Sequence, residues 1–215
     1  MGIEQAKHRL RTAKWRLSNW AVAKRADVLA TLRAPKTRKL ASQRGTDLDR
    51  WAKDSSYEDF WRERNEIIAA AILPGTRVLE FGAGLQSLRG LLDPTCKYQP
   101  TDLVARTPDC LICDLNVRPF PDLPDAEVAV LSGVLEYVHE PVEALRFIGR
   151  LAPTLICSYA TVKNGADTSD RHKNGFFNHF SEDEFLQTLQ CAGYSPQKVQ
   201  PWGDQIIVVA VLDGS

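Results

Sequence analysis

One stretch of the chain, residues 76–88, constrains the fold more than any other. It opens with a short run, Val78–Phe81, of the kind that forms a buried parallel strand. Gly82 and Gly84 follow, and the leucines of Leu85–Leu92 then recur with helical spacing. A strand, a glycine turn and a helix form the first unit of a nucleotide-binding α/β fold. Glycine permits the tight turn and the close approach of a ligand to the backbone.

The residues around this turn indicate what kind of nucleotide it suits. A dinucleotide would place its pyrophosphate at the start of the helix. Glu80 stands beside that point, and its carboxylate would repel phosphate but suits a cation. The third glycine of the dinucleotide pattern would fall at position 87, where the chain has Ser87. The stretch therefore favours a nucleoside that carries positive charge.

The motif Glu80-Phe81-Gly82-Ala83-Gly84 resembles the first motif of class I S-adenosylmethionine-dependent methyltransferases. The resemblance covers roughly residues 61–212, most of the chain. It implies S-adenosyl-L-methionine as cofactor, held at Glu80, Gly82 and Gly84. The chain departs from the family pattern at Gln86, where the family often has glycine, and we expect a different loop shape there.

Charge is distributed unevenly along the 215 residues, although the net charge is zero. Residues 1–50 carry 13 Lys and Arg against 4 Asp and Glu, so the remaining 165 residues have an acidic excess. We therefore predict two parts, a basic helical extension with its linker at 1–50 and a methyltransferase domain at 51–215. Within the first part we expect a helix at 4–33 that ends at Pro35, then a linker over Thr37–Gly45.

The basic extension has several interpretations. A basic helix with tryptophans can lie on an anionic membrane surface, contact nucleic acid, or pack on the domain or on a protein partner. We favour packing, with a peripheral membrane or protein contact through residues 1–45 as the alternative. No apolar run approaches the ~20 residues that span a bilayer.

The five cysteines predict a reducing cytoplasm, because their number is odd and no signal peptide precedes them. Cys110 and Cys113 form a C-x-x-C pair within an apolar run that we expect to be a strand. Residues three apart on a strand point to opposite faces, and no second pair completes a zinc site. We therefore predict buried thiols and no metal.

The rest of the chain alternates strands and helices. Asp47–Leu73 predicts a second helical segment, broken near Ser55. Two tightly joined final strands must be antiparallel, so the pattern predicts an α/β, Rossmann-like, seven-stranded methyltransferase sheet with a closing hairpin. After Val78–Phe81, the expected strands are Lys97–Thr101, Cys110–Cys113, Ala126–Leu131, Thr154–Tyr159, Gln197–Gln200 and Ile206–Leu212, and the expected helices are Pro141–Leu151 and Glu182–Ala192, the latter with a capping box at Ser181 and Glu184.

Ligands of open parallel sheets bind at the carboxyl ends of the strands. Asp102 lies there, 18 residues after Gly84, where a carboxylate can accept both ribose hydroxyls; an ordinary surface aspartate is the alternative. The resemblance implies that Asp114 accepts a hydrogen bond from the adenine amino group, with Leu115 on the same wall, although Asp also favours turns. By the same resemblance, Ser132 and Gly133 lie beside the methionine part and the acceptor.

A long polar segment, Ala160–Phe180, follows the fifth strand and so opens onto the same end of the sheet. A loop of this length is usually functional or disordered, and we interpret it as a lid over the acceptor. A hydroxyl acceptor would need a base, for which His179 and His172 are the candidates, with loop hydrogen bonding equally favoured. The aromatic run Gly175–Phe180 predicts that this part folds back onto the sheet and fixes His179 better than His172.

The leading functional hypothesis is methyl transfer to oxygen or nitrogen of a small molecule or a sugar or glycan. The acidic excess of the catalytic part argues against binding a nucleic acid across the site. A non-catalytic methyltransferase-like scaffold that uses its basic N-terminal arm is the alternative. A nicotinamide-dependent reductase is disfavoured by Glu80 and by the lack of a Tyr-x-x-x-Lys pair. We expect the protein in the cytoplasm, or peripherally at the membrane.

Overall fold

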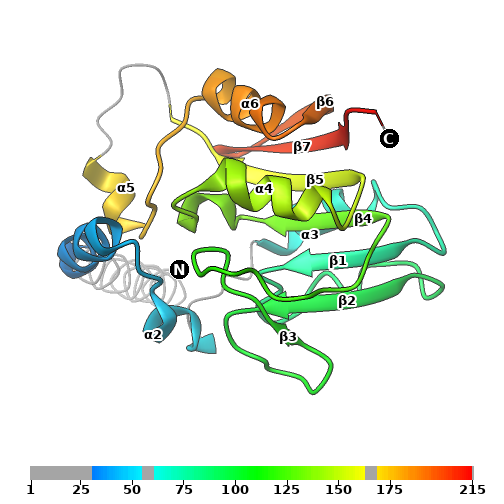
Figure 1. Ribbon diagram of the computed structural model, residues 1–215, viewed down its shortest axis with the longest axis horizontal. Helices are drawn as coiled ribbons and strands as arrows, with labels where there is room; N and C mark the ends of the chain where they lie inside the picture. The colour runs from blue at the N-terminus through cyan, green and yellow to red at the C-terminus, as the bar shows by residue number, and fades with distance from the viewer. Residues whose placement is uncertain (1–30, 55–60, 163–168, 215) are drawn as a thin grey trace, which may run out of the picture.

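A computed structural model describes residues 31–54, 61–162 and 169–214. The predicted basic helix at 4–33 lies almost wholly outside these residues. Within them, one mixed sheet has the strand order β3-β2-β1-β4-β5-β7-β6 (Figure 1). Its strands are β1 Arg77–Phe81, β2 Lys97–Asp102, β3 Leu111–Ile112, β4 Val128–Ser132, β5 Thr154–Ala160, β6 Tyr194–Trp202 and β7 Gln205–Leu212. The seven-stranded sheet predicted from the sequence is confirmed.

Strands β1 to β5 are parallel, and β7 pairs antiparallel with both β5 and β6, so the closing hairpin is also confirmed. From β1 the chain first builds outward through β2 to β3. It then returns to place β4 on the other side of β1. The neighbouring strands β1 and β4 therefore mark the topological switch point, beside which open α/β sheets bind their ligands.

Apolar residues alternate between two cores, one on each face of the sheet. Along β1, Leu79 and Phe81 join the larger core, whereas Val78 joins the smaller one. The larger core packs under α4 Pro141–Gly149 and α6 Glu182–Cys191, and the smaller one under α3 Trp61–Ala69 (Figure 1). Burial on both faces explains why β4 and β5 are almost continuous apolar runs in the sequence.

The helix expected at Leu85–Leu92 is wrong, because residues 84–91 form a series of turns. Gln86 has a φ of 56°, which breaks helical geometry, and the backbone bonds run from Gln86 to Ala83 and from Arg89 to Gln86. The leucine spacing was misleading, because Leu88 is fully buried whereas Leu85 is 53% exposed. The Gln86 side chain braces this loop by donating to Thr107 Oγ1 at 2.6 Å, and the difference in loop shape from the family pattern stays a prediction.

The N-terminal part also differs from expectation. Residues 31–43 are helical, so the helix does not end at Pro35 and most of Thr37–Gly45 is not a linker. Inside a helix, proline removes one backbone donor and its ring crowds the carbonyl four residues earlier, but burial of Ala34 and Thr37 outweighs this cost here. A short helix, α2 Leu48–Trp51, follows. No helix of the described residues is long and apolar enough to cross a membrane.

Candidate functional site

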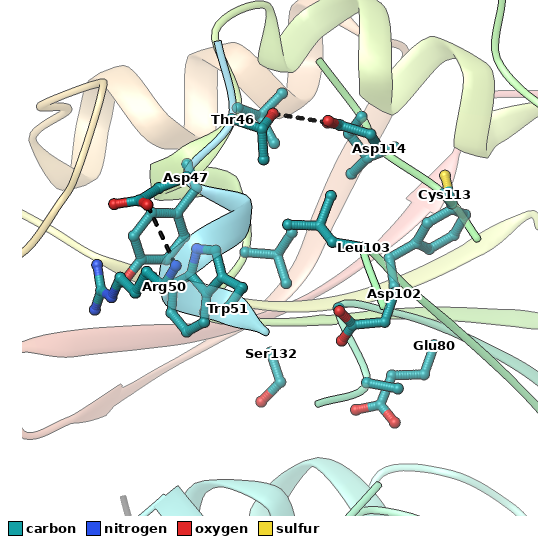
Figure 2. Close-up of a pocket in the computed structure, with 18 of the residues that line it drawn as sticks. Thr46, Asp47, Arg50, Trp51, Glu80, Asp102, Leu103, Cys113, Asp114 and Ser132 are labelled. Carbon is teal, nitrogen blue, oxygen red and sulfur yellow. Dashed lines mark hydrogen bonds between the residues drawn. The ribbon is translucent and has the colours of Figure 1, made fainter. Parts of the chain in front are cut away.

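A cavity of about 450 Å³ opens at the carboxyl ends of β1, β2 and β4, beside the switch point (Figure 2). All eight residues predicted to hold a cofactor lie at this end of the sheet, and seven of them line the cavity directly: Glu80, Gly82, Asp102, Asp114, Leu115, Ser132 and Gly133. Gly84, the eighth, is buried one residue beyond the lining residue Ala83. The topology thus brings together strand ends that are far apart in sequence.

The glycine turn shapes the floor of the cavity. Gly82 has a φ of 66°, and a Cβ placed there would lie 2.6 Å from Val134 Cγ2, so only glycine fits. The Gly84 amide donates to Asp102 Oδ2 at 2.6 Å, and the Ala83 amide donates to the Thr101 carbonyl at 3.0 Å. Asp102, only 4% exposed, therefore fixes the turn and presents its carboxylate to the cavity.

Glu80 is a buried carboxyl group at the centre of the site, with 2% of its surface exposed. Burial raises the pKa of Glu80 to about 8, although a hydrogen bond from the Tyr98 hydroxyl and the charge of Arg64 both oppose this shift. The protein therefore balances the negative charge of the ionised Glu80 carboxylate only in part. A cation in the cavity would supply the missing charge.

The end of β3 supplies a second wall. Asp114 Oδ1 accepts hydrogen bonds from Thr46 Oγ1 at 3.0 Å and from the Asn116 amide at 2.8 Å. Leu115 is 6% exposed, and the cavity lining there also includes Leu103. An apolar wall with a carboxylate beside it suits a purine ring with an exocyclic amine.

The opposite wall comes from α3, which faces the ends of β1 and β4. Ser132 Oγ donates to Asn65 Oδ1 at 2.7 Å. Arg64 is 4% exposed and lies against Gly133, where a Cβ would approach its Nη1 to 2.6 Å. Burial lowers the pKa of Arg64, but a guanidinium stays protonated in proteins. Its Nε has no hydrogen-bond partner among the described residues, so the site offers a buried donor to an anionic group.

The N-terminal part forms a further wall that was not predicted from the sequence, and its residues Thr46, Asp47, Arg50 and Trp51 line the cavity (Figure 2). The Gly45 carbonyl lies 3.0 Å from His139 Nε2. This contact joins residues 94 positions apart, and nothing local in the sequence announces it. His139 therefore anchors the N-terminal segment to the domain.

The same N-terminal part is bonded to the segment predicted as a lid. Arg33 Nη1 donates to the Lys173 carbonyl at 3.1 Å, and Arg50 Nη1 donates to the Asn174 carbonyl at 2.6 Å. Lys173 ends α5, Ser169–Lys173, a short helix not expected from the sequence. Beyond it, the Phe177 amide donates to the Glu136 carbonyl at 2.8 Å, and Phe177 lines the cavity. The predicted folding of Gly175–Phe180 back onto the sheet is present.

The two candidate bases do not line the cavity. His172 and His179 lie together, with ring centroids 5.0 Å apart, and His179 Nδ1 accepts a bond from Arg171 Nε at 3.2 Å. Burial, followed by the charges of Arg171 and His172, lowers the pKa of His179 to about 4. A base poised near neutral pH would need a higher value. The geometry gives the catalytic role of either histidine no support.

Positive and negative side chains line different walls of the cavity. The carboxyl groups of Glu80, Asp102 and Asp114 come from the strand ends, whereas the guanidinium groups belong to helices α2 and α3. The exception is Asp47, whose carboxylate accepts from Lys36 Nζ at 2.6 Å. A ligand that fills this cavity meets negative charge on one side and positive charge on the other.

No protein-family model and no curated protein matches the chain by sequence. Solved structures do match in fold. CalO1, a methyltransferase in calicheamicin biosynthesis in its S-adenosylhomocysteine-bound form, superposes with a TM-score of 0.56 and 20% identity over 70% of this chain and 54% of its own. A putative O-methyltransferase from Nostoc punctiforme gives a TM-score of 0.61 and 10% identity, over 86% of this chain and 71% of its own.

The 1,6-didemethyltoxoflavin N1-methyltransferase of Burkholderia thailandensis matches over most of both chains, 86% of this one and 89% of its own, with a TM-score of 0.57 and 18% identity. Its structure holds S-adenosylhomocysteine and 1,6-didemethyltoxoflavin. Against other similar structures, such as CalO1 and PhzM, this chain spans only about half of their length, 54% in each case. At these identities the likeness shows that the chain has the class I methyltransferase fold.

Proposed function

We propose that this protein is an S-adenosyl-L-methionine-dependent methyltransferase that acts on a small molecule. The observation that carries the proposal is the cavity at the switch point. It combines an undercompensated carboxyl at Glu80, an orphaned guanidinium donor at Arg64 and a carboxylate at Asp102. These groups match a nucleoside that carries a sulfonium, an ammonium, a carboxylate and a ribose diol.

Each part of this cofactor has a suitable partner in the chain. Asp102 would accept from the ribose hydroxyls while it holds the glycine turn. Asp114 and Leu115 would hold the adenine ring at its amine and its face. Glu80 would balance the positive charge of the methionine part, and Arg64 would take its carboxylate. Glycine at positions 82 and 133 lets Val134 and Arg64 pack closely against the strand ends that would hold the ligand.

When bound, the cofactor supplies a methyl group that is already activated on sulfur. The chain then has to bind an acceptor, orient it and exclude water, which is mainly catalysis by proximity. Gly175 and Phe177 of the lid segment line the cavity, as does the N-terminal wall, which supports this role for both segments. This arrangement supports O- or N-methylation. A small molecule is the favoured acceptor, and a sugar is the second candidate.

The alternative, a non-catalytic scaffold, is less favoured because the cavity keeps every group that the cofactor needs. The predicted membrane or protein contact through residues 1–45 stays a prediction. Any such contact would have to leave in place, or displace, the bonds that residues 33, 44 and 45 already make to the domain.

Isothermal titration calorimetry tests the proposal. S-adenosylmethionine and S-adenosylhomocysteine should bind, and NAD⁺ should not. Asp102→Ala should weaken binding by about 1–3 kcal/mol, because the ribose hydroxyls lose a charged acceptor. Asp204→Ala is the matched control, since this exposed aspartate lies in the turn between β6 and β7, outside the cavity lining. Binding of NAD⁺ together with no binding of S-adenosylhomocysteine would overturn the proposal.

A further inference from the structure

The Asp114 carboxylate is held by a segment that is remote in sequence. Thr46, which lies just before α2, donates from Oγ1 to Asp114 Oδ1 at 3.0 Å (Figure 2). The two residues stand 68 positions apart, and both line the cavity. The Asn116 amide donates to the same Oδ1 at 2.8 Å. Two donors thus occupy one oxygen of this carboxylate, whereas Oδ2 accepts no hydrogen bond from the described residues.

The side chain of Asn116 fixes the direction of these hydrogen bonds. Its Oδ1 accepts from the His139 backbone amide at 2.8 Å, and a backbone N–H can only donate. Its Nδ2 therefore points the other way, where it donates to the Tyr137 carbonyl at 2.9 Å and to Thr46 Oγ1 at 3.1 Å. Both hydrogens of the Asn116 side chain are then in use, so its amide has one orientation.

The Thr46 hydroxyl passes this direction on to Asp114. A hydroxyl carries one hydrogen and accepts through its lone pairs. Since Thr46 Oγ1 already accepts from Asn116, its single hydrogen is left for Asp114 Oδ1. An ionised carboxylate can only accept. The oxygen that remains, Asp114 Oδ2, therefore offers an acceptor to a ligand in the cavity.

The position of Thr46 is fixed by the residue before it. His139 Nε2 lies 3.0 Å from the Gly45 carbonyl, so the loop after β4 holds the chain at this point. The same loop supplies the Tyr137 carbonyl and the His139 amide that orient Asn116. The N-terminal segment, the end of β3 and the loop after β4 therefore form one hydrogen-bonded network beside the cavity.

An acceptor held in this way distinguishes between purine bases. The amine at C6 of adenine would donate to Asp114 Oδ2, whereas the carbonyl of hypoxanthine at the same position would face a carboxylate that has no hydrogen to share. A site built to bond one polar group rejects a ligand that leaves its groups unpaired. This discrimination depends on how firmly the carboxylate is aimed, and the donor that aims it from the side chains is Thr46.

We propose that Thr46 is a positioning residue that makes the site selective for adenine. It aims the Asp114 carboxylate at the ligand as a hydrogen-bond acceptor. The N-terminal segment is then part of the cofactor site in its own right. This inference deepens the proposed function, on which it rests for the identity of the ligand.

Calorimetry with S-adenosylhomocysteine and S-inosylhomocysteine, which carry an amine and a carbonyl at C6 respectively, tests this inference. The wild type should bind the adenosyl ligand at least about 10-fold more tightly. Thr46→Val keeps the shape of the side chain and removes the hydroxyl. It should weaken the adenosyl ligand about 10-fold and the inosyl ligand by less than about 2-fold, because the inosyl ligand gains nothing from an aimed acceptor. An equal loss for both ligands, or no loss for either, would overturn the inference.

Further variants locate the effect. Thr46→Ser keeps the hydroxyl and should restore the wild-type preference, while Thr46→Ala should repeat the selective loss even if the valine variant does not fold. Arg44→Gln is the matched control, because the exposed ion pair of Arg44 with Glu140 also attaches this segment but Arg44 does not line the cavity. It should leave both affinities within about 2-fold of wild type. A selective loss in Arg44→Gln, or in Thr46→Ser, would overturn the inference.

The two proposals fail separately. If S-adenosylmethionine and S-adenosylhomocysteine do not bind, the proposed function fails, and adenosine is compared with inosine on the same variants. Absence of a preference for adenosine would then overturn the inference as well. If S-adenosylhomocysteine binds and Thr46→Val keeps the full preference for it, only the inference about Thr46 fails.

Discussion

At the scale of single residues, the site depends on groups that are buried with a charge the protein does not fully balance. Glu80 is the clearest case, because its carboxyl is 2% exposed and its pKa is raised to about 8. Such a group is costly as an anion in the free protein and favourable beside a bound cation. Strong pKa perturbation inside a cavity is typical of functional sites.

This coupling predicts a pH dependence of cofactor binding. A bound cation lowers the pKa of Glu80, so binding below pH 8 releases a proton and becomes stronger as the pH rises. We expect the affinity for S-adenosylmethionine to increase between pH 6 and 7.5, by up to about 10-fold per pH unit. Calorimetry in two buffers of different ionisation enthalpy would measure both the affinity and the proton release.

The isosteric variant Glu80→Gln provides the control, since it keeps the volume and removes the titration. Its affinity should be lower at pH 7.5 and nearly flat across this range. A wild-type profile that is equally flat would show that Glu80 is already ionised in the free protein.

Glycines allow a second residue-scale prediction, because the chain offers three different environments for the same change. Gly133→Ala should both strain the backbone, at φ 68°, and displace Arg64, whose Nη1 would lie 2.6 Å from the new Cβ. We therefore expect weaker cofactor binding and a loss of stability of about 1–3 kcal/mol. Chemical denaturation and calorimetry would measure the two effects.

Two controls separate strain from the clash with Arg64. Gly203→Ala adds only strain, at φ 58° with no neighbour within 4 Å, and Gly90→Ala adds neither. Gly203→Ala should cost about 1 kcal/mol without affecting the cofactor, and Gly90→Ala should lie within about 0.5 kcal/mol of wild type. Normal cofactor affinity in Gly133→Ala would argue against a role for Arg64.

At the scale of elements, local patterns predicted the strands well and the irregular segments poorly. Strands β4 and β5 are buried on both faces, so their sequences are continuous apolar runs that need no tertiary context. The helix predicted over Leu85–Leu92 does not form, because leucine spacing cannot reveal that Gln86 takes a positive φ. The prediction that the helix ends at Pro35 was wrong because burial of Ala34 and Thr37 outweighs the helix-breaking effect of the proline. This burial is a tertiary effect, which a local pattern does not show.

Helix α6 gives the prediction that belongs to this scale, since its capping box was expected from the sequence and is present. Ser181 Oγ accepts from the Glu184 amide, and Glu184 Oε2 accepts from the Ser181 amide at 2.8 Å. Ser181→Ala should cost about 1 kcal/mol, a fall in Tm of about 2–4 °C for a chain of this size. Ser181→Thr keeps the acceptor and should stay close to wild type in the same thermal scans. An unchanged Tm for Ser181→Ala would mean that the cap adds no stability.

At the scale of the whole molecule, the site joins segments that the sequence does not connect. The residues proposed to hold the cofactor could be predicted because the carboxyl ends of parallel strands all lie at one edge of the sheet, wherever the strands stand in the chain. The N-terminal wall could not, because the bond from Arg50 to Asn174 spans 124 positions and no local pattern encodes it. His172 and His179 were candidate bases because they lie in the polar segment after the fifth strand. Only the structure shows that neither of them lines the cavity.

The bonds between the N-terminal part and the lid predict coupled dynamics. Arg33 and Arg50 join residues 31–51 to residues 173–175, so loss of both bonds should loosen both segments together. In hydrogen exchange, the double variant Arg33→Gln/Arg50→Gln should lose protection at residues 44–51 and at 174–180. Exchange in β4 and β5 should not change. Loss of protection in one segment alone would show that the two move independently.

The position of β7 has a consequence for how the chain reaches its fold during synthesis. β7 lies between β5 and β6 and forms the full antiparallel register with β5, from Ala160 opposite Gln205 to Thr154 opposite Val211. It is nevertheless the last of the seven strands to leave the ribosome. Until it does, a seven-residue apolar edge of the central sheet stays open to pairing with other chains. A nascent chain halted before residue 205 should therefore depend on chaperones far more than one that has passed residue 212.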